Sequence, residues 1–418
     1  MNRRMKLTFG LLLSSALLAA CGNGGNSGNT GNSGNGQTAG GKTVIRFATW
    51  DNEEDLEAQQ SMVDRFNESQ ENIEVQLEGL GADFDQVLTT GLGAGDAPDV
   101  MYMWNYPLYH DGLEPLDTYI EEEGADYKDN FYDALWNYNE IDDTIYGIPV
   151  GYTTQALYYN KELFDKADVD YPTADWTWED VHDASKKISA LDDSTYGFVM
   201  PGKPDPYDFE MFLWSNGTEY AGEDGQLDGH LNSSESVEVF SFFQDMLKDG
   251  SAVASEGYGS DEMQSGTAAM QVYGAWGIDG MNDAGIDYGI VEIPSFKGQQ
   301  SASILSSSGL AMSKDSEHKD AAWEFIKFWT NEEANKERID YELPVLHSVV
   351  ESENLEDDEL RSPFYSMLER SGDFTPTSFK VDNWTHISDD LELAFEEMFN
   401  PNALSNPQET LDGVAKAQ

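Results

Sequence analysis

The sequence predicts a folded α/β protein with two domains or lobes, and three observations support this prediction. From residue 42 onward, short apolar runs alternate with amphipathic ones, which is typical of strands and helices packed in layers. The chain has 418 residues, more than a single hydrophobic core usually organises. Hydrophobic residues make up 39% and aromatic residues 12%, which argues against the disorder that an extreme charge would otherwise suggest.

Strands are predicted where an apolar run is short, and helices where apolar residues recur three or four positions apart. The expected strands cover residues 43–49, 75–77, 99–104, 269–273, 288–293 and 309–313. The apolar faces of the expected helices are Ala58, Met62, Val63 and Phe66; Ala321, Ala322, Phe325, Ile326, Phe328 and Trp329; and Ile387, Leu391, Ala394, Phe395 and Met398. We find no internal repeat.

The N-terminus predicts export from the cytoplasm. Arg3, Arg4 and Lys6 form a basic start. Residues 7–20 then form an apolar run that is too short for a membrane span of about 20 residues. We therefore interpret residues 1–20 as a signal peptide and expect the protein to be extracytoplasmic.

Cys21 ends the stretch Leu18-Ala19-Ala20-Cys21, which resembles the lipobox of bacterial lipoproteins. The resemblance implies that a peptidase cuts before Cys21 and that its sulfur then carries a lipid, which anchors the protein to the cell membrane. An ordinary signal peptide that precedes a cysteine is the alternative. Cys21 is the only cysteine, so no disulfide can form within the chain. Residues 21–41 are uncharged and rich in Gly, Asn and Ser, which predicts a flexible tether with a reach of about 25 Å.

The charge of the chain excludes several classes of partner and chemistry. Lys and Arg number 23 against 79 Asp and Glu, a net charge of −56, so a nucleic-acid partner is not expected. The six histidines lack metal-ligand spacing, and no nucleotide loop or nucleophile motif is present, so we predict no cofactor, no metal and no catalysis. The many acids leave a calcium site open. Because so much charge self-repels when it is not screened, it also predicts a salt-exposed habitat.

Several short stretches follow one another in a specific order between residues 43 and 400. They are Gly95-Asp-Ala-Pro-Asp-Val100, Gly112-Leu-Glu-Pro-Leu-Asp117, Tyr146-Gly-Ile-Pro149, Leu157-Tyr-Tyr-Asn-Lys161, Gly266-Thr-Ala-Ala-Met270 and Tyr273-Gly-Ala-Trp276. Together they resemble the extracellular solute-binding proteins of ABC sugar importers, the family that includes maltodextrin-binding protein. The sequence departs from that pattern at Asp168, where glycine is common, and at Thr153, where maltodextrin binders carry an acid.

The resemblance implies a periplasmic-binding-protein-like fold, in which hinge strands join two α/β lobes around a central ligand cleft. It implies that the chain crosses between lobes near residues 151–154, 294–301 and 341–344. Lobe 1 would then comprise residues 42–152 and 300–343, and lobe 2 residues 153–299 and 344–418.

The chemistry of sugars indicates which residues to seek in that cleft. A pyranose ring has an apolar face that stacks on aromatic rings and a rim of hydroxyl groups that bonds to carboxylates and amides. The candidates are Trp50, Asp51, Trp104, Asn105, Thr153, Asp205, Tyr207, Trp276 and Trp384. The first four follow predicted strands, where α/β clefts open, and the other five rest on the resemblance. Each has a structural role as its alternative, and Trp136, Trp323 and Trp329 are expected in the core.

The expected function is that of a lipid-anchored, monomeric protein that captures a carbohydrate, expected to be an oligosaccharide, by hinge closure. It would deliver this ligand to the permease subunits of an ABC transporter. One alternative keeps the fold but binds a polyol, an osmolyte, a peptide or another cationic or polar solute. Another is a surface glycoside hydrolase, which needs two carboxylates facing one sugar.

Overall fold

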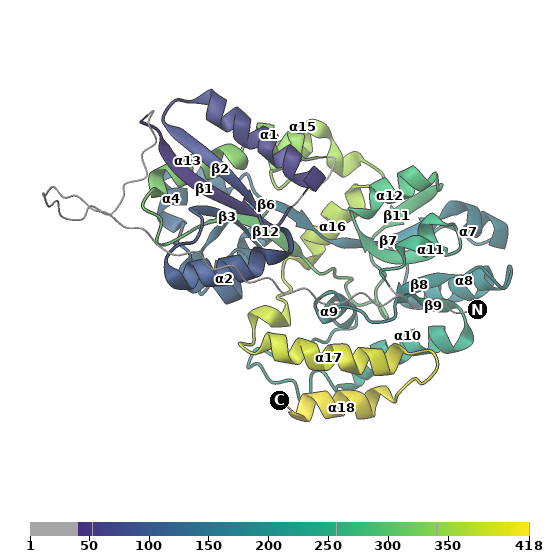
Figure 1. The fold of residues 1–418 in the computed structure, drawn as a ribbon. Coiled ribbons are helices and arrows are strands. Elements are labelled where there is room, and N and C mark those ends of the chain that lie inside the picture. The colour runs from purple at the N-terminus through teal and green to yellow at the C-terminus, as the bar shows by residue number, and fades with distance from the viewer. Residues whose placement is uncertain (1–40, 52, 256, 340–341, 418) are drawn as a thin grey trace, which may run out of the picture.

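The computed structural model describes residues 41–51, 53–255, 257–339 and 342–417. The predicted signal peptide, Cys21 and nearly all of the predicted tether lie outside these residues. The described chain folds into two α/β lobes, each with its own sheet (Figure 1).

Lobe 1 is built on a mixed sheet of five strands. In spatial order these are β2 (Ile73–Gly79), β1 (Thr43–Thr49), β3 (Val100–Met103), β12 (Ser306–Met312) and β6 (Gly147–Thr153). β1 pairs in parallel with β2 and β3, whereas β12 runs antiparallel to β3 and β6. Phe47 of β1 packs with ring centroids 5.0 Å from Phe325 and 4.9 Å from Trp329, which joins the sheet to a covering helix.

Nine helices and a small hairpin of two strands complete lobe 1 in the described part of the chain. The helices are α1 (Glu53–Ser69), α2 (Phe84–Ala94), α3 (Tyr106–Tyr109), α4 (Asp117–Glu123), α5 (Ala125–Lys128), α6 (Asp133–Tyr138), α13 (Lys319–Trp329), α14 (Glu332–Glu337) and α15 (His347–Glu353). The hairpin pairs β4 (Glu140–Ile141) with β5 (Thr144–Ile145).

Lobe 2 has an antiparallel sheet of three strands, with β7 (Gln155–Asn160) between β10 (Met270–Gly274) and β11 (Tyr288–Val291). β8 (Phe198–Pro201) and β9 (Ala252–Ser255) form a parallel pair beside it. The helices are α7 (Lys161–Ala167), α8 (Trp178–Ser189), α9 (Pro206–Trp214), α10 (Ser234–Asp249), α11 (Ser260–Gln264), α12 (Gly277–Ala284), α16 (Ser362–Ser371), α17 (Trp384–Phe399) and α18 (Pro407–Ala417).

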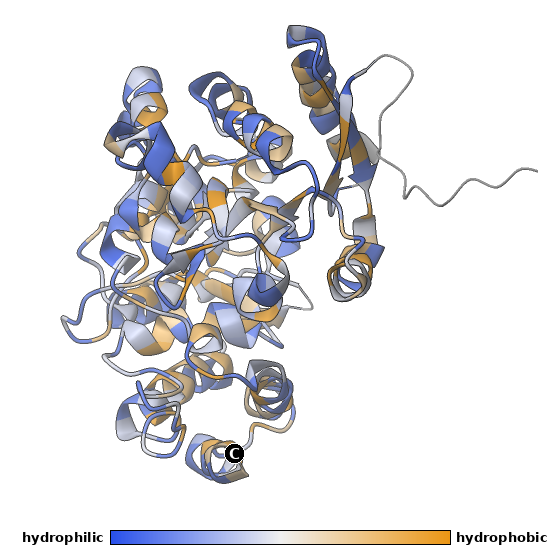
Figure 2. Ribbon diagram, turned by 90° about the vertical axis from the view of Figure 1, so that its left-hand side faces the viewer, coloured by the Kyte–Doolittle hydropathy of each residue, from blue (hydrophilic) through white to orange (hydrophobic). Residues whose placement is uncertain are grey.

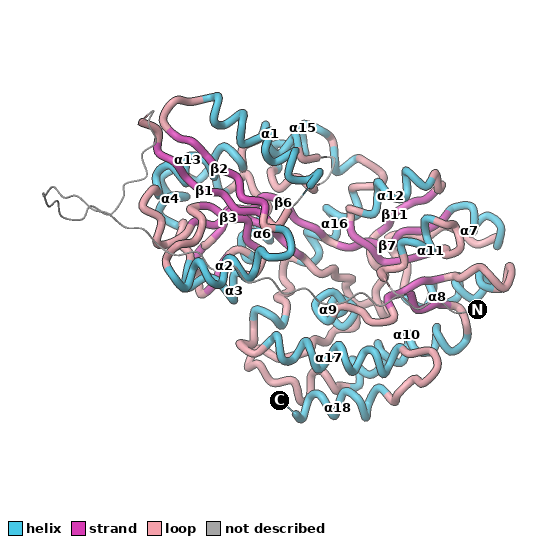
Figure 3. Tube along the Cα trace, in the orientation of Figure 1, coloured by secondary structure: helices cyan, strands magenta, loops and turns pink. Residues whose placement is uncertain are grey.

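The chain passes between the lobes where one strand continues into the next. β6 belongs to the first sheet and β7 to the second, and only Thr154 separates them (Figure 3). Thr154 is buried, and its Oγ1 donates a hydrogen bond to the carbonyl of Phe364 in α16 at 2.8 Å. The return takes place between the end of β11 and the start of β12.

The last part of the chain differs from the predicted division. The prediction assigns residues 344–353 to lobe 2, whereas contacts place α15 against lobe 1. Leu346 pairs with Phe131, and the His347 amide donates to the Asn130 carbonyl at 2.8 Å. The next helix, α16, contacts both β7 and α6, so the chain leaves lobe 1 after α15. Sequence periodicity could not reveal this, because it does not say which sheet a helix packs on.

Most predicted elements are confirmed. Each predicted strand overlaps one of β1, β2, β3, β10, β11 and β12. The stripe of α17 is buried at Ile387, Leu391, Ala394, Phe395 and Met398, and Trp136, Trp323 and Trp329 are buried as expected. Ala58 is the exception, because it is exposed and Gln59 takes the buried position in α1. The structure adds further elements that the sequence did not reveal, among them β6, β7, β8, β9 and α18.

The distribution of hydropathy along the elements agrees with a folded α/β protein. In Figure 2 the helices carry hydrophobic residues beside hydrophilic ones, and the loops are mostly hydrophilic. Within the described ranges, no helix combines the length and the apolar character that a membrane crossing requires.

Candidate ligand-binding site

A cleft of about 430 Å³ lies between the two lobes, and we call it the central cleft. Lobe 1 provides most of its wall, and the segment between β10 and α12 of lobe 2 closes one side. Its lining residues are Trp50, Trp104, Gly151, Tyr152, Thr153, Ala275, Trp276, Ser306, Ser307, Ser308, Glu342 and Leu343. Four of the residues predicted from the sequence, Trp50, Trp104, Thr153 and Trp276, therefore line one cavity.

The three tryptophans give the cleft its aromatic surface. Trp104 is 44% exposed and Trp276 48% exposed, which is unusual for so large an apolar side chain. Trp50 is half-buried, and its ring packs 5.0 Å from Tyr102. The ring of Trp276 lies over Gly274, where a Cβ atom would be 2.1 Å from Cζ3 of the indole. Gly274 therefore leaves the space that lets Trp276 fold back at the end of β10.

Hydroxyl groups also line the central cleft. Ser306, Ser307 and Ser308 begin β12, and the hydroxyl of Ser307 donates to the Gly151 carbonyl at 3.3 Å. Thr153 Oγ1 donates to the carbonyl of Thr154 at 3.0 Å, which leaves the oxygen lone pairs available as acceptors. Such groups can exchange hydrogen bonds with the hydroxyls of a polar ligand.

Glu342 is the one charged side chain among the described residues that line the central cleft. Its Oε2 lies 3.0 Å from Nε of Arg338, whose side chain is 2% exposed. Burial raises the pKa of the Glu342 carboxyl above its ordinary value; the Arg338 guanidinium opposes that shift, and the Asp51 carboxylate adds to it. The Arg338 guanidinium and the Glu342 carboxylate thus form an ion pair of opposite charges beside the cleft.

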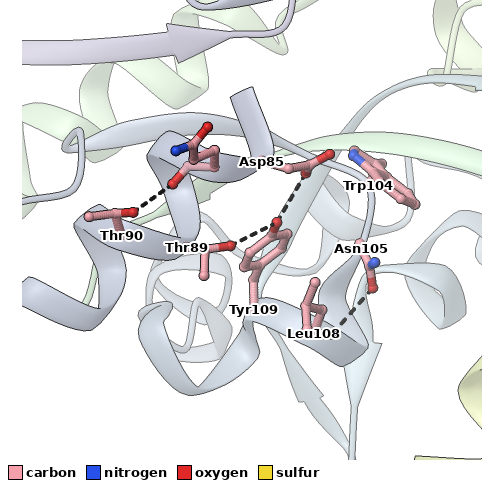
Figure 4. A pocket seen from close by; sticks show the side chains of 8 residues that line it. Asp85, Thr89, Thr90, Trp104, Asn105, Leu108 and Tyr109 are labelled. Atoms are coloured by element: carbon pink, nitrogen blue, oxygen red, sulfur yellow. Dashed lines mark hydrogen bonds between the residues drawn. The ribbon is translucent and has the colours of Figure 1, made fainter. Parts of the chain in front are cut away.

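Two further cavities adjoin the central cleft. The outer groove, of about 410 Å³, shares Trp104 with it and runs along α2 and α3 (Figure 4). There the Tyr109 hydroxyl donates to Asp85 at 3.0 Å and lies 3.5 Å from the hydroxyl of Thr89. The far pocket, of about 250 Å³, shares Ala275, Trp276, Glu342 and Leu343 with the cleft; Ile278, Asp279, Ile339 and Arg361 complete its lining.

The other predicted site residues do not line the central cleft. Asp51 accepts hydrogen bonds from Thr49 Oγ1 and from Gln59. Asn105 caps α3 by accepting from the Leu108 amide at 3.3 Å, and it lines only the outer groove.

Three further candidates belong to lobe 2. Asp205 is exposed and caps α9 through the Tyr207 amide at 2.8 Å, and the Tyr207 hydroxyl donates to the Leu305 carbonyl at 2.7 Å. Trp384 is half-buried, with its ring 6.2 Å from that of Tyr220. These contacts give Asp205 and Tyr207 structural roles, and no pocket described above includes Trp384.

Of the polar side chains that line the cleft, the sequence pointed to Thr153 but not to the three serines or Glu342. The run Ser306-Ser307-Ser308 was visible at the start of a predicted strand, and it could have suggested a hydroxyl-lined edge. Glu342 had no distinguishing signal, because it is one of 79 acidic residues. Within the described residues, no group of three or more His, Cys, Asp or Glu side chains could hold a metal ion.

Comparison with known proteins agrees with the fold. The profile of the bacterial extracellular solute-binding proteins matches residues 50–336. The galactooligosaccharide-binding protein of Bacillus subtilis (strain 168) is 25% identical over 347 residues, 78% of this chain and 79% of that protein. The sn-glycerol-3-phosphate-binding periplasmic protein of Brucella abortus (strain 2308) is 33% identical over 170 residues, 38% of this chain and 39% of that protein.

A solved structure extends the similarity to nearly the whole chain. The ABC substrate-binding protein from Listeria monocytogenes, in complex with cycloalternan, superposes with a TM-score of 0.77 at 27% identity. The alignment covers 90% of this chain and 98% of that one. All three proteins are binding proteins by name, and the family is extracellular. The motifs of the sequence, the two-lobed fold and the matched profile agree: the chain belongs to the bacterial extracellular solute-binding protein family.

Proposed function

We propose that this protein is the lipid-anchored binding component of an ABC importer and that its ligand is a neutral oligosaccharide. The observation that carries the proposal is one cleft lined by Trp50, Trp104 and Trp276, with hydroxyl groups and a carboxylate beside them. Aromatic rings suit the apolar faces of sugars, and the polar groups suit their hydroxyls. The galactooligosaccharide-binding relative and the cycloalternan complex support the same class of ligand.

The adjoining cavities support a ligand of several sugar units. The outer groove shares Trp104 with the central cleft, and the far pocket shares Trp276 with it. An extended ligand can therefore stack on both tryptophans, whereas a single ring would leave the flanking cavities to water. This favours a ligand of several sugar units.

The protein would act as a monomer and would capture its ligand by closing the two lobes around it. Trp104 belongs to lobe 1 and Trp276 to lobe 2, so a ligand that touches both binds the closed arrangement better and shifts the population toward it. The permease would then recognise the closed form. The anchor at Cys21 would keep the protein at the membrane surface, within reach of that permease.

Two other ligand classes are less favoured by the charges in the cleft. A phosphate ester, as in the name of the Brucella relative, needs a free cation. Arg361 of the far pocket instead lies 3.6 Å from Asp358, and Asp279 and Glu342 face the same space. A quaternary ammonium ligand would suit three tryptophans, but Arg338 already balances Glu342.

Hydrolysis of a bound sugar is also disfavoured. A glycoside hydrolase needs two carboxylates roughly 5–9.5 Å apart on either side of one bond. Among the described residues that line the central cleft, the one carboxylate is that of Glu342.

Calorimetry of the purified protein tests the proposed ligand. Maltotriose, maltotetraose and galactotriose are compared with glucose, glycerol 3-phosphate and glycine betaine. The proposal expects tighter binding of the oligosaccharides than of glucose and no binding of the two charged solutes. Binding of glycine betaine or glycerol 3-phosphate alone would refute it, and turnover of a saccharide would identify a hydrolase.

Cell fractionation tests the anchor. The Cys21→Ala variant should leave the membrane fraction, because the lipid is attached to the cysteine sulfur. A variant that stays with the membrane would show that the protein is held there by another route.

A further inference from the structure

Glu342 occupies the junction between the two inner cavities. It lines both the central cleft and the far pocket, and so do Trp276, Ala275 and Leu343. Two backbone contacts fix its position. Its amide donates to the Arg338 carbonyl at 2.8 Å, and the next residue, Leu343, pairs with Tyr152 of β6. The carboxylate is therefore held beside the strand that continues into lobe 2.

Gly151 makes this position possible. A Cβ atom at residue 151 would lie 2.8 Å from Cδ of Glu342 and 3.0 Å from each carboxylate oxygen. Any side chain at residue 151 would push the carboxylate away from the floor of the cleft. Gly151 comes from β6 and Glu342 from the segment after α14, so two distant parts of the chain create the site together.

The carboxylate keeps unused capacity to accept hydrogen bonds. Arg338 forms an ion pair with it, but Oε2 and Nε are not aligned as a hydrogen bond. No other described residue donates a hydrogen bond to Glu342, and its Oε2 is buried without such a partner. Arg338 is oriented by its own bond from Nη1 to the Trp329 carbonyl at 3.0 Å. The Glu342 side chain is nevertheless 24% exposed and lines both cavities, so the hydroxyl groups of a ligand can reach the carboxylate, which has lone pairs beyond those that face Arg338.

We propose that Glu342 is a specificity-determining residue, which accepts hydrogen bonds from hydroxyl groups of a neutral sugar stacked on Trp276 and excludes sugars that carry a carboxylate. The inference rests on the proposed function. A carboxylate aligns with two hydroxyl donors on neighbouring ring carbons, whereas an acidic sugar would bring a second negative charge against it. Asp279 in the far pocket adds to that repulsion.

The test compares Glu342→Gln with wild type and with Glu333→Gln. Glu333 lies in α14, and its side chain is 74% exposed, so it controls for the loss of one negative charge. Calorimetry uses maltotriose and galactotriose, and the same two saccharides oxidised at C6 to uronic acids. Because hydrogen bonds to a charged group are strong, E342Q should weaken binding of the neutral saccharide about tenfold or more.

The ratio of neutral to acidic binding separates recognition from a structural role. E342Q should lower the preference for the neutral saccharide over its acidic counterpart, whereas a purely structural defect would weaken both equally. Thermal unfolding checks that the variant is folded. If E342Q does not fold, Glu342→Asp tests the same contact, because it keeps the charge but withdraws the carboxylate by one methylene group.

Two outcomes overturn the inference. Neutral binding by E342Q within about twofold of E333Q, or an unchanged neutral-to-acidic ratio, would refute the role of Glu342 alone. A wild-type protein that binds no saccharide would refute the proposed function, and this inference with it.

Discussion

Replacement of Trp276 by alanine is the most direct test of the aromatic surface. Trp276 is 48% exposed, which for a side chain of ~250 Å² leaves about 120 Å² open to a ligand. A sugar ring that covers about 60 Å² of this surface contributes about 1.5 kcal/mol at ~25 cal/mol per Å². Trp276→Ala should therefore raise the Kd of the oligosaccharide by a factor of about ten.

A second variant changes the position of the same ring without removing it. At Gly274 an added Cβ would lie 2.1 Å from the indole, so Gly274→Ala should displace Trp276 and weaken binding as well. Calorimetry measures both variants against Leu393→Ala, which removes an apolar side chain that is 61% exposed and lines none of the three cavities. Affinities within about twofold of this control would refute the stacking role of Trp276.

Three further predictions concern stability. Glu210 is fully buried, accepts from the Thr377 amide at 2.9 Å, and has a pKa raised by burial to about 7, so its neutral form stabilises the fold and this contribution disappears as the pH rises through about 7. The loss begins near the unfolded pKa of 4.5 and is complete just above pH 7, so thermal unfolding between about pH 4.5 and 8 should show a loss of about 3 kcal/mol in wild type that Glu210→Gln lacks; parallel curves would contradict this. Because salt shortens charge repulsion from about 30 Å at 0.01 M to about 3 Å at 1 M, unfolding should require a higher temperature in molar KCl, and a lower one would contradict the reasoning. Trp329 is fully buried, and its indole donates to the Tyr102 hydroxyl at 3.0 Å. Trp329→Ala should therefore lower the free energy of unfolding by ~3–5 kcal/mol in a urea titration. A loss below ~1 kcal/mol would contradict the place of Trp329 in the core.

Local patterns predicted the elements of the fold because burial leaves a periodic trace in the sequence. The apolar stripe of α17 and the run in β1 are buried as their spacing indicates. The assignment of α15 failed for a different reason. Val349 and Val350 are buried, but their spacing does not show whether lobe 1 or lobe 2 covers them. Which lobe a helix joins depends on contacts with Phe131 and Asn130, which lie more than two hundred positions earlier in the chain.

Among the candidate site residues, those of a rare type gather in the central cleft more often than those of a common type. The chain has 10 tryptophans. Trp50 and Trp104 were conspicuous at expected strand ends and Trp276 through the family resemblance, and all three line one cleft. Polar candidates were ambiguous, because the residues that bind sugars also cap helices. Asn105 and Asp205 each accept from a backbone amide at the start of a helix, a role that the sequence alone does not distinguish from ligand binding.

The charge of the chain and the chemistry of its cleft are separate properties. Of the 79 acidic residues, the three cavities described above are lined by Asp85, Asp279 and Glu342. Asp85 is engaged by the Tyr109 hydroxyl, and Glu342 is balanced by Arg338. A neutral ligand in the central cleft therefore meets a local field set by one ion pair, while the acidic surface determines solubility and the response to salt. Salt should therefore change the stability of the protein far more than its affinity for a neutral sugar. A strong salt dependence of that affinity would show that a charged group without a counter-charge lies in or near the cleft.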